Sequence, residues 1–201
     1  MNERSSPMHR PPTTVFLDRD GVINRKRPEG AYVERWDQFE FLPGAIEALE
    51  LLAAAGIRTV VVTNQRGVAL GRMTTAAVDE IHGRMQAALV ARHAQCAAVL
   101  VCPHEEGWCD CRKPRIGLFR QAQALMPEID ISRAVVVGDS AGDLLAAATL
   151  DCPAYLVAGD ADVATILAEH PGLAIRGWGP SLLDVVADLM GRPSTGGGPT
   201  V

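Results

Sequence analysis

The chain has 201 residues, of which 48% are hydrophobic and 21% are charged, so it fits one globular domain with a sizeable core. Its formal net charge of −5 argues against a nucleic-acid or anionic-membrane surface, because such partners need a broad basic patch. Its apolar runs fall short of the roughly 20 residues of a membrane span, and residues 1–12 lack the apolar core of a signal peptide. We therefore expect a cytoplasmic monomer without nucleic-acid or membrane partners.

The predicted elements alternate between strands and helices. In chain order they are a strand at 13–17, a helix at 44–55, a strand at 57–62, a helix at 75–92, a strand at 97–101, a helix at 116–126, a strand at 134–137, a helix at 141–150 and a strand at 154–157. A helix at 160–169, a strand at 173–176 and a helix at 180–190 complete the series.

This alternation predicts one α/β domain over residues 13–190. Its sheet should be doubly wound and mostly parallel, with helices on both faces. The two ends, 1–12 and 191–201, are rich in Pro, Gly and Ser with little apolar content, so we expect them to be disordered tails.

Two acidic residues follow the first predicted strand, at the edge where doubly wound sheets bind ligands. Asp18 and Asp20 stand two residues apart and precede Gly21, so extended backbone turns both carboxylates to the same side. Two such charges favour a divalent cation, Mg²⁺, between them. The alternative for this tetrapeptide taken alone is a surface turn.

Polar residues also follow the other strands. Thr63 and Asn64 offer donors to phosphoryl oxygens, or else cap a turn. Lys113, which with Lys26 makes up all the lysines of the chain, supplies a compact ammonium before a helix, or else lies in a solvated basic loop. Asp139 follows the fourth strand and is available to a metal, while its neighbour Asp143 binds the metal through water or caps the helix.

In this order the four motifs resemble those of the haloacid dehalogenase superfamily of phosphotransferases. They are Asp18-Arg19-Asp20-Gly21, Thr63-Asn64, Lys113 and Gly138-Asp139. Over about residues 15–150 the sequence also resembles the superfamily's heptose 1,7-bisphosphate 7-phosphatases, which belong to a histidinol-phosphatase-related group. The resemblance implies a Mg²⁺-dependent phosphoric monoester hydrolase whose partner is a small phosphorylated metabolite.

The resemblance also implies a role for each motif residue. Asp18 is the nucleophile that forms an aspartyl phosphate, and Asp20 is the general acid and base. Mg²⁺ is held by the carboxylates of Asp18 and Asp139 and by the backbone carbonyl of Asp20. The substrate-binding residues are Thr63, Asn64 and Lys113 for the transferring phosphate, and Gln65 and Arg112 for the rest of the molecule.

Four residues with metal-binding side chains precede Lys113. Cys102-x-His104 and Cys109-x-Cys111 supply the four ligands of a closed, tetrahedral structural Zn²⁺ site. The alternative is buried cysteines beside an exposed histidine, since a disulfide is not expected in the cytoplasm. Zinc would brace the loop and take no part in the chemistry. Outside this cluster, Cys96 and Cys152 are expected in the core, and His82 and His93 at the surface or the core edge.

The spacing of the motifs leaves no room for a cap domain, so an open site with loop-determined specificity is expected. The loops at 24–32 and 65–72 and the zinc loop are the candidates. The resemblance implies hydrolysis of D-glycero-D-manno-heptose 1,7-bisphosphate at the 7-position. The alternative is histidinol phosphate, because only four residues separate His104 from Cys109, and short zinc loops are a feature of histidinol-phosphate phosphatases. A non-catalytic zinc-bearing scaffold is a third hypothesis, which predicts damage at Asp18, Asp20 or Lys113.

Overall fold

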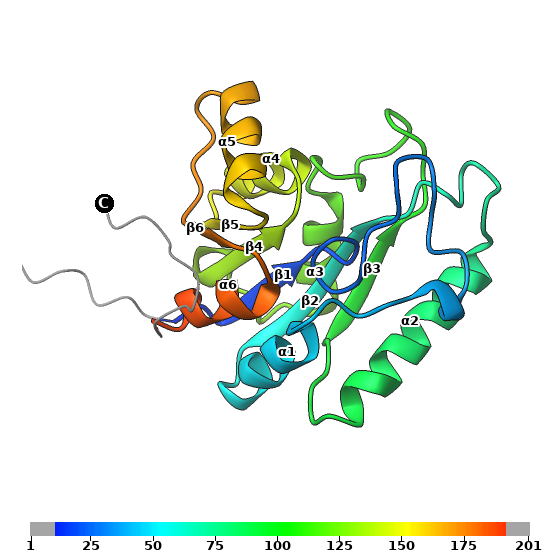
Figure 1. Cartoon of the computed structure of the whole chain (residues 1–201), viewed down its shortest axis with the longest axis horizontal. Helices are drawn as coiled ribbons and strands as arrows, with labels where there is room; N and C mark the ends of the chain where they lie inside the picture. Colours follow the sequence, from blue (N-terminus) through cyan, green and yellow to red (C-terminus); the bar gives the residue numbers. More distant parts are fainter. Residues whose placement is uncertain (1–10, 192–201) are drawn as a thin grey trace, which may run out of the picture.

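The structure, a computed structural model, describes residues 11–191 and confirms the predicted fold class. Six strands form one parallel sheet in the order β3-β2-β1-β4-β5-β6 (Figure 1). The tails predicted at 1–12 and 191–201 lie almost entirely outside the described residues. The strands are β1 (Thr14–Leu17), β2 (Arg58–Asn64), β3 (Ala98–Cys102), β4 (Ala134–Gly138), β5 (Ala154–Val157) and β6 (Gly177–Gly179).

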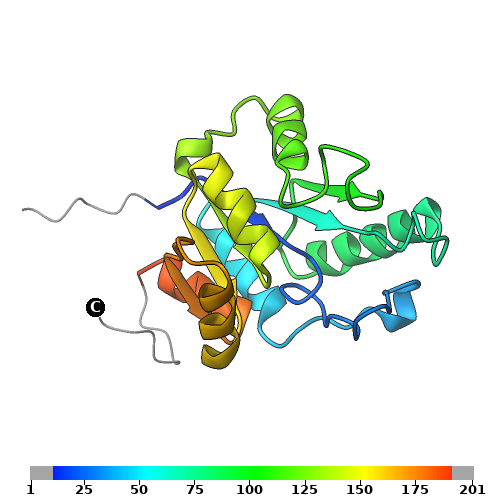
Figure 2. The ribbon, with the colours of Figure 1, turned by 90° about the horizontal axis from the view of Figure 1, so that it is seen from above.

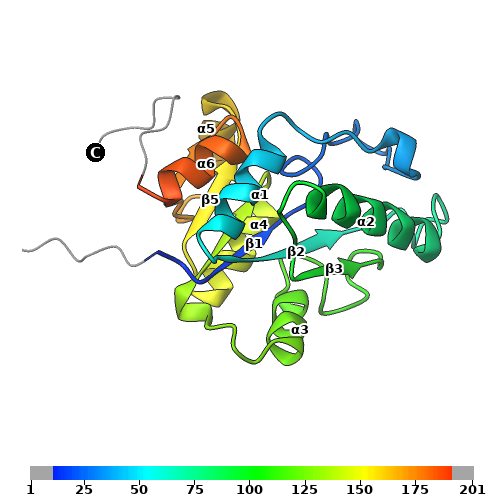
Figure 3. The ribbon, with the colours of Figure 1, turned by 90° about the horizontal axis from the view of Figure 1, so that it is seen from below.

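Helices cover both faces of this sheet. Buried residues of α1, α2 and α6 pack on one face, and buried residues of α3, α4 and α5 pack on the other. Figure 3 shows α1 and α2 on one side of the strands with α3 on the opposite side, and Figure 2 gives the reverse view. The helices are α1 (Ala45–Ala54), α2 (Thr75–Val90), α3 (Gly117–Leu125), α4 (Ala141–Leu150), α5 (Asp160–Glu169) and α6 (Leu182–Leu189), with short 3-10 helices η1 (Trp36–Gln38) and η2 (Ile131–Arg133).

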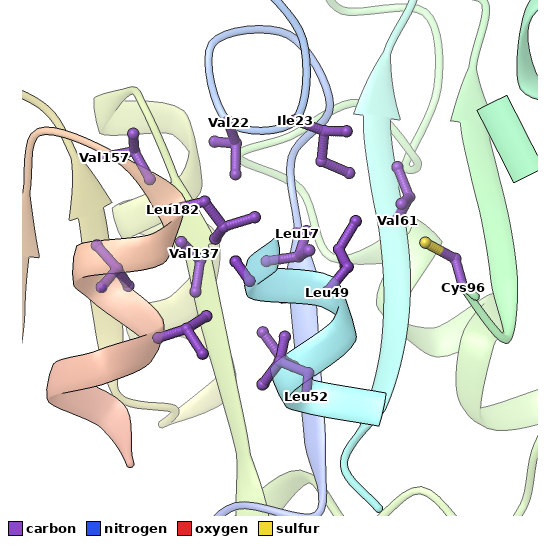
Figure 4. Close-up of a cluster of buried hydrophobic side chains, with 14 of the residues drawn as sticks. Leu17, Val22, Ile23, Leu49, Leu52, Val61, Cys96, Val137, Val157 and Leu182 are labelled. Carbon is purple, nitrogen blue, oxygen red and sulfur yellow. The ribbon is translucent and has the colours of Figure 1, made fainter. Parts of the chain in front are cut away.

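The two-residue period of the strands divides the core into two layers. In β1, Leu17 belongs to the cluster under α1 and α6, whereas Phe16 belongs to the cluster under α3 and α4. Figure 4 shows the first cluster, in which Leu17 faces Leu49 of α1 and Leu182 of α6. Because successive side chains of a strand point to opposite faces, a strand buried on both sides is mostly apolar, as β4 and the last three residues of β1 are.

The last predicted strand was wrong in position. The expected run 173–176 is not a strand; instead β6 spans Gly177–Gly179 and pairs with β5. The side chains of Leu173 and Ile175 pack against a core cluster without joining the sheet. Glycine is depleted in strands, so the sequence Gly-Trp-Gly carries little strand signal. At Gly177, an added Cβ would lie 2.7 Å from a carboxylate oxygen of Asp188 and 3.0 Å from the ring of Tyr155, so a larger residue would fit only if these side chains moved.

The connections between the first three strands consist of loops and helices. Between β1 and β2 the chain forms loops, η1 and α1, and between β2 and β3 it forms loops and α2. This arrangement is consistent with the expected absence of a cap domain. Among residues 11–191, no helix is long and apolar enough to cross a membrane.

The core can be tested on α3. Phe119 is fully buried and meets the ring of Phe16 edge to face, with ring centroids 5.0 Å apart. Phe119→Ala should therefore lower the free energy of unfolding by about 3–5 kcal/mol, measured by urea denaturation. Leu125, on the same helix but 61% exposed, provides the control: Leu125→Ala should change the free energy by less than about 0.5 kcal/mol. Equal effects of the two substitutions would contradict this packing.

Candidate active site

The residues predicted at the strand ends lie together at the carboxyl edge of β1, β2 and β4. The strand order reverses at β1, and open parallel sheets bind ligands at such a point. Asp18 follows β1, and its backbone N–H donates to a carbonyl oxygen of β4 at 2.9 Å. Thr63 and Asn64 end β2, and Asp139 follows β4. Lys113 reaches the same edge from the loop before α3.

The ammonium group of Lys113 bridges two carboxylates. Its Nζ lies 3.0 Å from Oδ1 of Asp18 and 2.6 Å from Oδ1 of Asp143, and the side chain of Lys113 is 3% exposed. Burial opposes the charged form, but the carboxylates of Asp143 and Asp18 raise the pKa of Lys113 well above its usual value. Lys113 is therefore protonated at neutral pH and compensates both acids.

Asp143 belongs to this cluster and does not cap its helix. Its carboxylate accepts hydrogen bonds from Nζ of Lys113 and from Oγ of Ser140, each at 2.6 Å, whereas a cap would accept from a backbone N–H. Gly138 faces it so closely that an added Cβ would lie 2.1 Å from Cγ of Asp143. The glycine that ends β4 therefore makes room for the buried carboxylate.

Three aspartates form a site that fits a divalent cation. One carboxylate oxygen each from Asp18, Asp139 and Asp143 lie within 4.8 Å of one another. Burial, reinforced by the neighbouring acids and opposed by Lys113, raises the pKa of Asp18 to about 7. Among the described residues, none donates a hydrogen bond to the buried Oδ1 of Asp139. Mg²⁺ takes oxygen ligands, so it would satisfy this oxygen and relieve the repulsion.

Lys26 also contacts the carboxylates, although the motifs assigned it no role. Its Nζ lies 2.6 Å from Oδ2 of Asp139, while its side chain is 57% exposed. Burial opposes its charge, but Asp139 raises the pKa of Lys26 overall. Two signals in the sequence pointed to this residue: the scarcity of lysine and a position within the 24–32 loop. The contact itself depends on how that loop folds over β4.

Four hydrogen bonds hold the carboxylate of Asp20. Nη2 of Arg19 contacts Oδ1 at 2.9 Å and Oδ2 at 2.8 Å. Nδ2 of Asn24 donates to Oδ1 at 2.9 Å, and Nε2 of Gln65 donates to Oδ2 at 2.8 Å. Burial by itself would raise the pKa of Asp20, but the Arg19 charge and these hydrogen bonds lower it overall. Asp20 is thus an ionised, oriented carboxylate beside Asp18.

The side-chain amides of Asn64 and Gln65 form hydrogen bonds that connect residues of the site. The side-chain amide of Asn64 donates to the backbone carbonyl of Lys113 at 3.1 Å and accepts from its backbone N–H at 3.0 Å. The side-chain amide of Gln65 donates to Asp20 and, at 2.9 Å, to Oγ1 of Thr63. Asn64 therefore holds the loop that carries Lys113, and Gln65 links Thr63 to the acid pair.

A cavity of about 430 Å³ lies over this edge of the sheet. Its lining includes the acid pair, Thr63, Asp139 and the loop 26–33. Basic side chains also line the cavity, and Nη1 of Arg112 is buried without a hydrogen-bond partner among the described residues. The basic residues that line the cavity are Lys26, Arg27, Arg66 and Arg112.

The predicted zinc ligands meet in one cluster beside the cavity. Cys102 ends β3, and its Sγ lies 3.5 Å from Sγ of Cys109, which is 3.2 Å from Sγ of Cys111. Nδ1 of His104 lies 3.3 Å from Cys111 and 3.8 Å from Cys102. Tetrahedral zinc with Zn–S bonds near 2.3 Å separates its sulfur ligands by about 3.8 Å, so the sulfur atoms need to move apart only slightly to accommodate the ion. All five cysteines are free thiols.

Other predictions about Cys and His residues have mixed outcomes. Cys96 and Cys152 are buried, as expected. His93 is exposed, as expected, and lies in the turn after α2 with a φ of 57°. His82 is 7% exposed and lies 3.0 Å from Nη1 of Arg19, so it belongs to the buried side of α2.

The comparisons with known proteins point to one group of phosphatases. A family model described as polynucleotide kinase 3 phosphatase matches residues 14–162. A Mycobacterium tuberculosis protein named D-glycero-alpha-D-manno-heptose-1,7-bisphosphate 7-phosphatase is 43% identical over 151 residues, covering 72% of this chain and 79% of the relative. A Pseudomonas aeruginosa protein named as the phosphatase of the beta anomer is 38% identical over 144 residues, covering 71% of this chain and 79% of the relative.

A solved structure is similar over nearly the whole chain. The D,D-heptose 1,7-bisphosphate phosphatase from B. bronchiseptica, complexed with magnesium and phosphate, superposes with a TM-score of 0.78 and 33% identity. The match covers 89% of this chain and 98% of that structure.

The raised pKa of Asp18 predicts a pH-dependent stability in protein without added divalent cation. The folded state retains the proton up to a pH of about 7, whereas the unfolded chain loses it near 3.8. The stabilisation is complete below the unfolded value and is lost as the pH rises through about 7. The free energy of unfolding of the wild type should therefore fall over this range relative to Asp18→Asn.

Urea denaturation at a series of pH values measures this difference. Asp79, exposed on α2, provides the control, and Asp79→Asn should follow the wild type throughout. Parallel curves for the wild type and Asp18→Asn would contradict the electrostatic account of the site.

Proposed function

The chain belongs to the polynucleotide kinase 3 phosphatase family of haloacid dehalogenase-type phosphatases, and on this premise we propose that it hydrolyses the 7-phosphate of D-glycero-D-manno-heptose 1,7-bisphosphate. One observation carries the chemical part of the proposal: the carboxylate of Asp18 lies 3.0 Å from the ammonium of Lys113 and has an oxygen within 4.8 Å of a carboxylate oxygen of Asp139. A nucleophile, a phosphate-binding cation and ligands for a divalent cation thus share one site.

Asp18 acts as the nucleophile in this proposal. The backbone N–H of Arg19, at 2.7 Å, and Nζ of Lys113, at 3.0 Å, both contact Oδ1, which leaves Oδ2 for in-line attack on phosphorus. The P–O bond to the sugar breaks as the Asp18–phosphate bond forms. Thr63 and Lys113 stabilise the charge on the transferring oxygens. Bound Mg²⁺, held by Asp18, Asp139 and the backbone of Asp20, would keep Asp18 ionised and offset its repulsion from the phosphate.

Asp20 exchanges protons with the leaving group and with water. In the free protein it is ionised, as the lowered pKa indicates. A phosphate dianion placed beside it raises its proton affinity, because like charges disfavour the ionised form. The protonated carboxyl then donates to the departing sugar oxygen. In the second step the regenerated carboxylate removes a proton from the water that hydrolyses the Asp18 phosphate.

The charges of the cavity favour a substrate with a second anionic group. Lys26, Arg27 and Arg112 line the cavity, and the buried Nη1 of Arg112 has no partner among the described residues. A second phosphate would satisfy such a guanidinium. Histidinol phosphate instead carries an amine, which these charges would repel. The names of the similar proteins from M. tuberculosis and P. aeruginosa also support the bisphosphate.

Zinc, in this proposal, has a structural role. Its four ligands come from the segment that connects β3 to the loop of Arg112 and Lys113. Cys111 directly precedes Arg112, so zinc coordination would fix the start of that loop. Because all four positions are filled by protein, water has no place on the ion. We further place the enzyme in the cytoplasm as a monomer, a reducing setting in keeping with its five free thiols.

Assays of phosphate release test the function. With Mg²⁺, both anomers of the heptose bisphosphate and histidinol phosphate are compared, and kcat/KM for the bisphosphate should be at least about 100-fold higher than for histidinol phosphate. Asp18→Asn should lower kcat by about 10⁴-fold or more, whereas Asp79→Asn should retain wild-type activity. Full activity of Asp18→Asn would refute the mechanism, and hydrolysis of histidinol phosphate alone would refute the substrate.

Metal analysis of purified protein tests the zinc site. The wild type should contain a stoichiometric amount of zinc, and Cys109→Ser should lose most of it and unfold at a lower temperature, because a closed structural site contributes directly to folding. Cys96→Ser is the matched control, since Cys96 is buried but outside the cluster: it should keep its zinc even if it is destabilised. Wild-type protein without zinc would exclude the site.

A further inference from the structure

Arg19 is a buried cation that has no role of its own in the proposed mechanism. Its side chain is fully buried, an expensive environment for a guanidinium unless its charge and its donors are matched. Nη2 binds both carboxylate oxygens of Asp20, and Nη1 contacts Nε2 of His82 at 3.0 Å. The guanidinium carbon lies 6.0 Å from the centre of the Phe39 ring. Arg19 is therefore held between Asp20 on one side and α2 on the other.

The contact with His82 has only one chemically possible direction. A guanidinium has donors and no acceptor, so Nε2 of His82 must accept the hydrogen bond and the imidazole proton must sit on Nδ1. Burial and the nearby charge of Arg19 lower the pKa of His82 to about 3, which keeps the ring neutral. His82 is thus a fixed acceptor that orients the guanidinium of Arg19.

We propose that His82 is a positioning residue of the reaction, acting through Arg19 on the carboxylate of Asp20. The inference rests on the proposed function, in which Asp20 protonates the leaving oxygen. A general acid must be held within hydrogen-bond reach of the atom that it protonates. Asn24 and Gln65 also bind Asp20, but Arg19 is the only one of the three donors that is charged and that touches both oxygens.

Loss of the His82 acceptor on α2 would weaken the positioning of the Asp20 carboxylate. Without His82, Nη1 of Arg19 would remain buried without a partner, and a buried unsatisfied donor is costly. The guanidinium would rotate or draw in water, and its two contacts with Asp20 would weaken. Asp18, Lys113 and Asp139 do not touch His82, so substrate binding and nucleophilic attack would be preserved while proton transfer suffered.

The test compares two phosphate esters in His82→Leu, which removes the acceptor, and His82→Gln, which keeps an acceptor oxygen. The sugar of the heptose bisphosphate leaves as a basic alkoxide and needs a proton, whereas the p-nitrophenyl group of p-nitrophenyl phosphate leaves as a stable phenolate and does not. In His82→Leu, kcat/KM for the sugar ester should fall by about 10-fold or more, part of the 10²- to 10⁴-fold that positioned acid–base groups contribute. For the aryl ester the fall should be several-fold smaller.

Two comparisons separate positioning from a structural role. His82→Gln should regain most of the lost activity toward the sugar ester. Gln86, on the same helix, bonds to the backbone of Cys96 at 2.7 and 3.0 Å and lies outside the site, so Gln86→Leu should lower stability but change kcat/KM for both esters less than about twofold. Urea denaturation checks that all variants are folded under the assay conditions.

Equal losses of kcat/KM for the two esters in His82→Leu, or no loss for either, would overturn the proposal while leaving the proposed function intact. Wild-type protein that hydrolyses neither ester would instead overturn the proposed function, and with it the premise of this inference. A selective loss for the sugar ester that His82→Gln restores would support both.

Discussion

Compensation of buried negative charge is the constraint on which the site depends. Four aspartates gather at one edge of the sheet, and carboxylates in such a poorly solvated place repel one another strongly. Three cations compensate these four acids: Lys113 and Lys26 come from other segments of the chain, whereas Arg19 directly precedes its partner Asp20. The loops that carry Lys26 and Lys113 are therefore held at the site by charge as well as by packing. The pairs are Lys113 with Asp18 and Asp143, Arg19 with Asp20, and Lys26 with Asp139.

The sheet and two glycines make this concentration of charge possible. The parallel register brings the ends of β1, β2 and β4 level, so residues distant in sequence become neighbours. At Gly21, where φ is +87°, an added Cβ would lie 2.2 Å from a carboxylate oxygen of Asp139, and Gly138 leaves space for Asp143 in the same way. The backbone of both motifs thus approaches the acids more closely than any side chain would allow.

Much of this site was predictable from the sequence because its residues follow strands whose signal is strong. Runs such as Val60-Val61-Val62 and Val135-Val136-Val137 are apolar on both faces, so strand ends, and the polar residues after them, were easily located. The prediction failed where local signal was weak. β6 is Gly-Trp-Gly, and its place in the sheet comes from pairing with β5 rather than from its own residues.

The sequence alone determined the fold class and located the acid pair, the lysine and the cluster of cysteines and histidine, because each is a local pattern of side-chain chemistry at a strand end or in one loop. Tertiary structure decided which side chains that are distant in the sequence meet. Lys26 reaches Asp139 across 113 positions, and Arg19 reaches His82 across 63. Such pairings depend on the paths of loops and the rotation of a helix, which are set by packing of the whole chain and leave no local pattern to read.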